Sequence, residues 1–187
     1  RQPFRHLDRN DTIVAVLLAI TYMLLFPSSV SLNVVSPSIH TTVAGYDSAT
    51  HGQTVMAFNL AYGLGRLLTG FFVDLVEPRF ALALLVLVAA GCNFALGLTQ
   101  PTSGSAYISA LAGLNGFAQS GTWSAILKHV YYYYRPAQYG RLVTIIAIAA
   151  RVGQILATTI LTAILANDRL EWRDAMWAAA GLAIGSI

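Results

Sequence analysis

Two arginine residues lie deep inside stretches of sequence that are otherwise apolar enough to cross a membrane. Arg66 lies within residues 52–76, and Arg151 lies within residues 142–166. A guanidinium group in a membrane interior is retained only where it faces protein, water or an anionic partner. Because guanidinium groups bind carboxylates and phosphates through charge-assisted hydrogen bonds, Arg66 and Arg151 are the first candidates for a substrate site.

The two arginines are expected to lie at a similar depth in the membrane. At a rise of about 1.5 Å per residue, Arg66 is about 12 Å from Asp74, and Arg151 is about 15 Å from Arg141 on the same side. Both distances end near the middle of a hydrocarbon core about 30 Å thick. Every carboxylate lies outside the apolar stretches or, like Asp74, near the end of one. We therefore expect both arginines to line one central cavity, where an anion, or an acid from helices beyond this chain, completes the pair.

Polar amides inside the apolar stretches are the next candidates for substrate contact. They are Asn33, Asn59, Asn93, Asn115, Gln119 and Gln154. Asn115 and Gln119 are the strongest of these candidates, although a hydrogen bond between helices is an equally good interpretation for any single amide. No nucleophile–base pair is visible, Cys92 is the only cysteine, and His40 and His51 lack the spacing of a metal site. We therefore expect no enzymatic activity, no metal and no cofactor.

The elements that carry these residues are predicted to be membrane-spanning helices. The chain is 56% hydrophobic and only 10% charged, with a mean hydropathy of +0.62. A soluble domain has roughly 25% charged residues, and a spanning helix needs about 20 apolar residues. Suitable stretches are residues 12–35, 52–76, 80–98, 105–130 and 142–166, and a sixth stretch begins near Ala175. We expect a basic N-terminal arm, residues 1–11, followed by an all-α, six-helix transmembrane bundle, residues 12–187.

The distribution of basic residues predicts the orientation of the bundle. If the spans alternate in direction, one side carries Arg1, Arg5, Arg9, Arg79, Lys128, Arg135 and Arg141. The other side carries only Arg169 and Arg173. The positive-inside rule then places the N-terminus on the cytoplasmic side, or on the matrix or stromal side in an organelle. Topology also explains the net charge of +3 better than nucleic-acid binding does, so the expected partner is the lipid bilayer and not a nucleic acid.

Small residues and prolines predict how the helices pack. Small residues recur every four positions at Ala57, Ala61 and Gly65 and at Ala112, Gly116, Ser120 and Ser124. Such faces allow two helix backbones to approach closely. Pro27 and Pro37 lie within or just beyond the first stretch, and each removes a backbone hydrogen bond. Because a freed carbonyl in a membrane must be covered by protein or water, we expect the first helix to border a cavity.

A recognisable motif joins the second and third stretches. Residues 70–79, GFFVDLVEPR, resemble the gating-loop motif of the major facilitator superfamily, G-x-x-x-D-x-x-x-x-R. The short connection forces the two helices into a hairpin. Asp74, at the membrane edge, can pair with a basic group or a helix N-terminus in one conformational state. The resemblance makes Gly70, Asp74 and Arg79 candidate gating residues, and the alternative is a polar turn between two helices.

Further segments resemble the organophosphate:phosphate antiporters of this superfamily over about residues 20–160. Residues 61–66, AYGLGR, look like the A-Y-G-x-x-K of that family's second helix. The N-G-x-x-Q, W, R and G of the family are matched, without gaps, by NGFAQ at residues 115–119, Trp123, Lys128 and Gly140. In these relatives the second-helix cation helps to bind the phosphate group. The resemblance therefore implies a substrate-binding role for Arg66 and adds Tyr62, in the same motif, to the candidates.

Two positions depart from this family. By a gapless count, its first-helix phosphate-binding arginine falls near Ser29, and its fifth-helix histidine falls near Ala150. Neither Ser29 nor Ala150 can replace the arginine or the histidine of the family. Arg151 adjoins the missing histidine, so either a cation has been relocated or the ancestral site has decayed and Arg151 pairs elsewhere.

The resemblance implies the amino-terminal six-helix half of a major-facilitator carrier, with substrate bound between two such halves. Only thirteen residues run from Ala175 to Ile187, and the chain begins with Arg1 rather than Met. We therefore expect a truncated sixth helix and a piece of a longer protein. The expected function is transport of a small anionic solute, an organophosphate or an organic acid, by alternating access. The alternative is a transport-inactive, carrier-derived structural subunit that binds other subunits of a membrane complex.

Overall fold

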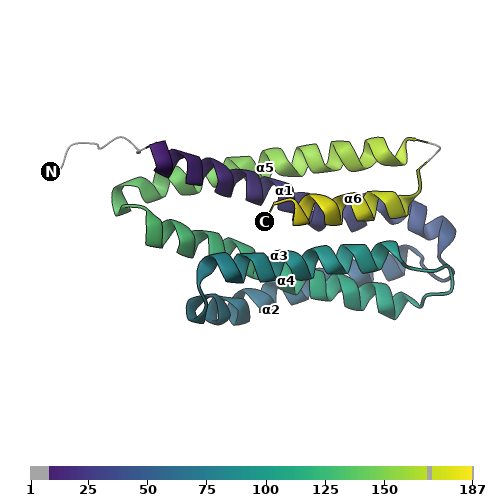
Figure 1. Ribbon diagram of the computed structural model, residues 1–187. Helices are drawn as coiled ribbons and strands as arrows, with labels where there is room; N and C mark the ends of the chain where they lie inside the picture. The colour runs from purple at the N-terminus through teal and green to yellow at the C-terminus, as the bar shows by residue number, and fades with distance from the viewer. Residues whose placement is uncertain (1–8, 168–169, 187) are drawn as a thin grey trace.

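The computed structural model describes residues 9–167 and 170–186, and these residues form a bundle of helices that run side by side (Figure 1). The helices are α1 (Arg9–Thr42), α2 (Ser48–Leu75), α3 (Pro78–Gly97), α4 (Ser105–Tyr133), α5 (Pro136–Leu165) and α6 (Trp172–Ile184). No strand occurs in these residues. Because α1 begins at Arg9, the last three residues of the expected N-terminal arm are helical. Arg1, Arg5 and Arg169 lie outside the described residues.

The prediction of an all-α membrane bundle is confirmed. Within the described ranges, α1, α2, α3 and α5 are each long and apolar enough to cross a membrane. The 29 residues of α4 are also long enough, but this helix is less apolar. Its polar residues Asn115, Gln119 and Ser120 are buried, so they face neighbouring helices rather than lipid. The 13 residues of α6 are too few to cross a core about 30 Å thick.

The first helix runs past its predicted end at residue 35 and includes both prolines. It continues because Val35 and Ile39 are fully buried in the core, which compensates for the hydrogen bond lost at Pro37. Pro27 frees the carbonyl oxygen of Met23, four residues earlier. A Cβ atom added at Gly153 of α5 would lie 2.6 Å from that oxygen, so the α5 backbone covers the freed carbonyl.

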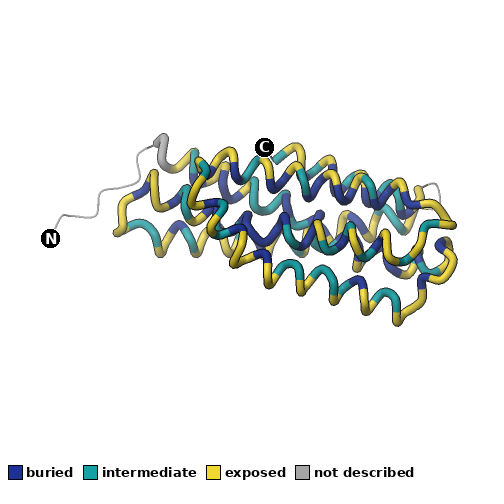
Figure 2. The backbone as a smooth tube through the Cα atoms, turned by 90° about the horizontal axis from the view of Figure 1, so that it is seen from below, coloured by how far each residue is buried: buried dark blue, intermediate teal, exposed yellow. Residues whose placement is uncertain are grey.

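Helix α2 packs closely against α4, and α1 packs closely against α5. A Cβ atom at Gly116 would overlap the carbonyl oxygen of Phe58, and one at Gly65 would overlap the hydroxyl of Ser120. The small-residue faces of α2 and α4 therefore lie in a close helix contact, as the spacing predicted, and each helix is the partner of the other. Figure 2 shows the buried positions, in dark blue, recurring along the helices where they face one another.

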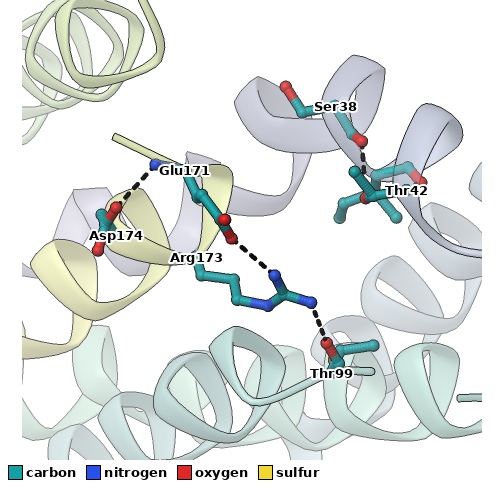
Figure 3. A network of polar contacts seen from close by, with 7 residues as sticks. Ser38, Thr42, Thr99, Glu171, Arg173 and Asp174 are labelled. Atoms are coloured by element: carbon teal, nitrogen blue, oxygen red, sulfur yellow. Dashed lines mark hydrogen bonds and ion pairs between the residues drawn. The ribbon is translucent and has the colours of Figure 1, made fainter. Parts of the chain in front are cut away.

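A polar network fixes the start of α6 against the loop between α3 and α4 (Figure 3). Arg173 donates from Nη1 to Oε2 of Glu171 at 2.7 Å and from Nη2 to the carbonyl oxygen of Thr99 at 3.0 Å. The backbone N–H of Glu171 donates to Oδ2 of Asp174 at 2.7 Å, which caps the helix N-terminus. Along its length, α6 packs against α1 and α3.

The helix connections define two ends of the bundle that a labelling experiment can distinguish. The α2–α3 and α4–α5 connections lie at one end, and the α1–α2 and α3–α4 connections lie at the other (Figure 1). Thr102 and Ala137 are exposed at opposite ends. We expect Thr102→Cys and Ala137→Cys, each in a Cys92→Ala background, to react with a membrane-impermeant thiol reagent from opposite sides of sealed vesicles. Reaction of both from the same side would contradict the topology, and the cysteine-free parent measures background labelling.

Candidate functional site

A pocket of about 410 Å³ opens between α1, α2, α4 and α5. Its volume lies in the range of about 300–1,000 Å³ that is typical of small-molecule sites. The lining of this pocket takes no residue from α3 or α6. The expectation that the first helix borders a cavity is confirmed, because four residues of α1 form part of the wall: Tyr22, Leu25, Phe26 and Ser29.

Arg151 of α5 lies in the wall of this pocket. Its Nη1 donates to Oε1 of Gln154, one turn further along the same helix, at 3.3 Å. The Arg151 side chain is otherwise exposed, and Gln154 also lines the pocket. Arg151 therefore presents a guanidinium group to the pocket with most of its donors available to a ligand.

Arg66 does not line this pocket, unlike its expected partner Arg151. Its guanidinium group lies 4.9 Å from the centre of the Tyr62 ring, and its Nη2 donates to the Tyr62 hydroxyl at 2.9 Å. Tyr62 does line the pocket, so Arg66 lies one helical turn beyond the wall and is held there by a cation–π contact.

A chain of hydrogen bonds between α1 and α4 orients the two predicted amides. Ser29 donates to Oε1 of Gln119, Gln119 donates to Oδ1 of Asn115 at 2.8 Å, and Asn115 donates to the carbonyl oxygen of Ser28 at 3.0 Å. Gln119 lines the pocket, whereas Asn115 is buried behind it. Asn115 thus holds Gln119 in place and does not itself reach the pocket.

Aromatic rings of α1 and α2 form part of the pocket wall. Tyr22 and Phe26 of α1 meet edge to face, with ring centres 5.4 Å apart. Phe58 and Tyr62 of α2 lie nearly parallel, at 12° and 6.1 Å. Of these rings, only Tyr62 was predicted from the sequence to contact substrate. The signal for the others was their spacing of four residues, which places each pair on one face of a helix.

The three predicted gating residues lie at the end of the bundle that holds the α2–α3 connection. Gly70 and Asp74 line a second cavity of about 510 Å³ between α2, α4 and α5. The carboxylate of Asp74 is exposed and makes no ion pair with any residue that the structure describes. Arg79 pairs instead with Glu77, with 2.5 Å between Nε and Oε1. The structure therefore brings Gly70 and Asp74 together and leaves Arg79 on the surface.

Comparison with known proteins assigns the chain to a family. The family model described as Major Facilitator Superfamily matches residues 16–187. The chain belongs to the major facilitator superfamily. This superfamily chain is also 27% identical over 142 residues to a probable hexose phosphate transport protein of Chlamydia pneumoniae. That match covers 75% of the chain and 30% of the relative, so the chain spans about 30% of the length of the curated relative it matches.

In this major facilitator chain, Lys128 of α4 caps the end of α2. Its Nζ donates to the carbonyl oxygens of Val73 at 2.5 Å, Asp74 at 2.9 Å and Val76 at 2.9 Å. A cation at a helix C-terminus satisfies carbonyls that lack partners in the helix and interacts favourably with the helix dipole. The role of Lys128 is therefore to tie α4 to the hairpin that carries Asp74.

Proposed function

We propose that the complete protein transports a small organic anion across a membrane by alternating access. The observation that carries this proposal is the position of Arg151 in a pocket halfway along the 30-residue α5. Major-facilitator carriers bind substrate near the middle of the membrane, between two halves of the protein. A guanidinium group at that depth supplies the charge that an anion requires when it leaves water.

The chemical class of the anion is the finer part of the proposal. The name of the similar chlamydial protein favours a phosphate ester, while a single guanidinium group in the pocket also favours an organic acid with one negative charge. In this proposal, Arg151, Tyr62 and Gln119 contact the substrate, Arg66 approaches it at the edge of the pocket, and Asn115 orients Gln119.

The hairpin that carries Asp74 is proposed to take part in gating. Its exposed carboxylate is available to a basic group or helix N-terminus outside these helices, and Lys128 holds the hairpin in place. The end that carries Arg79, Arg135 and Arg141 is proposed to face the cytoplasm, matrix or stroma.

Uptake by the full-length protein in liposomes tests the proposed transport. We expect saturable, time-dependent uptake of at least one labelled anion from a panel of inorganic phosphate, glucose 6-phosphate and benzoate. Protein-free liposomes provide the control for leakage. Folded protein that moves none of these anions would contradict transport and favour the structural subunit. Ser29 and Ala150, which replace an arginine and a histidine of the similar antiporters, are compatible with that alternative role.

A further inference from the structure

The described residues that line the pocket carry little positive charge. Among the lining residues that the structure describes, Arg151 is the only one with a positive charge. A phosphate ester carries a charge of about −1.5 to −2 at pH 7 and three strong acceptor oxygens. A carboxylate carries one charge and two oxygens, which one guanidinium group matches with two parallel hydrogen bonds. The charge of the pocket therefore suits a carboxylate better than a phosphate.

Three neutral donors of the pocket are committed to other protein groups. Ser29 donates its hydroxyl hydrogen to Gln119, and Thr122 donates to the carbonyl oxygen of Gln119 at 2.7 Å. Gln119 itself donates to Asn115. These donors are therefore less available to the oxygens of an anion, which leaves Arg151 and the donor groups of Tyr22, Asn59, Tyr62 and Gln154 to bind it.

The walls of the pocket suit a flat ring. Phe58 and Tyr62 of α2 contribute two nearly parallel rings, and Tyr22 and Phe26 of α1 contribute an edge-to-face pair. Aromatic faces and edges attract a further aromatic ring in stacked or edge-to-face arrangements. Leu25 adds an apolar surface to the α1 wall.

We infer that this pocket binds an aromatic monocarboxylate, whose carboxylate pairs with Arg151 and whose ring lies between the aromatic walls. This inference rests on the proposed function and names the substrate class for the same site. It differs from the phosphate ester suggested by the name of the similar chlamydial protein, because it follows from the residues that line this pocket.

Matched competitors test each part of the inference. Uptake of labelled benzoate is measured with full-length protein in liposomes, in the presence of unlabelled benzoate, phenyl phosphate, cyclohexanecarboxylate or glucose 6-phosphate. Phenyl phosphate keeps the ring and changes the anionic group, whereas cyclohexanecarboxylate keeps the carboxylate and changes the ring. We expect benzoate to compete about tenfold more strongly than either analogue, and glucose 6-phosphate to compete least.

The outcomes separate this inference from the proposed function. If the protein takes up a phosphate ester, and phenyl phosphate competes as strongly as benzoate or more strongly, the carboxylate assignment is overturned. The proposal of anion transport would still hold. Equal competition by cyclohexanecarboxylate would overturn the aromatic assignment. Uptake of no anion would overturn both the inference and the proposed function.

A variant of the wall adds an independent test. Phe58→Leu should reduce the preference for benzoate over cyclohexanecarboxylate and leave the preference over phenyl phosphate unchanged. Leu64→Ala, on the exposed face of α2, serves as the matched control and should change neither preference. A Phe58→Leu variant that folds and keeps the full aromatic preference would contradict the role of this wall.

Discussion

Replacing Arg151 with glutamine is expected to abolish measurable anion transport while leaving the protein folded. Arg151 is the charged group of the pocket, and its side chain donates a hydrogen bond to Gln154 on the same helix. Loss of a charged hydrogen-bonding partner in a site closed to water costs about 2–5 kcal/mol. Since about 1.4 kcal/mol corresponds to a factor of ten, anion affinity should fall at least about thirtyfold. Uptake in liposomes and the melting temperature measure the two effects separately.

Two further arginines provide controls for this result. Arg66→Gln should weaken transport less than Arg151→Gln, because Arg66 lies beyond the pocket wall at Tyr62. Arg141→Gln removes an exposed charge at the end of the bundle and should leave anion affinity unchanged. Normal uptake by Arg151→Gln would place the anion site elsewhere, and a large fall in its melting temperature would indicate a structural role.

Replacing Gly116 with alanine is expected to destabilise the bundle strongly for so small a change. The new Cβ atom would overlap the backbone carbonyl of Phe58, which cannot rotate away as a side chain can. Overfilling a well-packed contact costs about 1–3 kcal/mol, and each kcal/mol lowers the melting temperature of a chain of this size by roughly 2–4 °C. Thermal unfolding in detergent measures the change.

Gly113→Ala, one turn earlier on the same helix, is the matched control. Its Cβ atom would lie 3.7 Å from the carbonyl oxygen of Ala57, an ordinary contact. Alanine also favours a helix over glycine by up to about 1 kcal/mol, so this variant should be neutral or slightly stabilised. Equal melting temperatures for Gly116→Ala and Gly113→Ala would show that α2 and α4 are not in close contact.

The fold could be predicted from the sequence because apolar length determines where a helix can cross a membrane. The start of α4 at Ser105 and the close approach at Gly116 followed from composition and spacing alone. The end of α1 could not be predicted in this way. Its extension through Pro37 depends on the burial of Val35 and Ile39 against other helices, which no local pattern reveals.

The candidate site was only partly predictable, because the direction of a side chain depends on its neighbours in space. Helical spacing placed Tyr62 and Arg66 on one face, but the contact between them turned the guanidinium group away from the pocket. Likewise, the spacing of Tyr22 and Phe26 would look the same on a lipid-facing surface. The hydrogen bond from Ser29 to Gln119 joins residues 90 positions apart and leaves no trace in the local sequence.

The carbonyl oxygen of Met23, covered by Gly153, has a mechanical consequence. Because Pro27 has already removed the backbone hydrogen bond to this oxygen, a change in the curvature of α1 at this turn breaks no further bond of that kind. Tyr22 precedes the proline and Ser29 follows it, and both line the pocket. The width of the pocket is therefore linked to the bend of one helix. A substrate that is larger or smaller than the pocket would therefore be accommodated first by bending of α1 at Pro27, before any whole helix has to move.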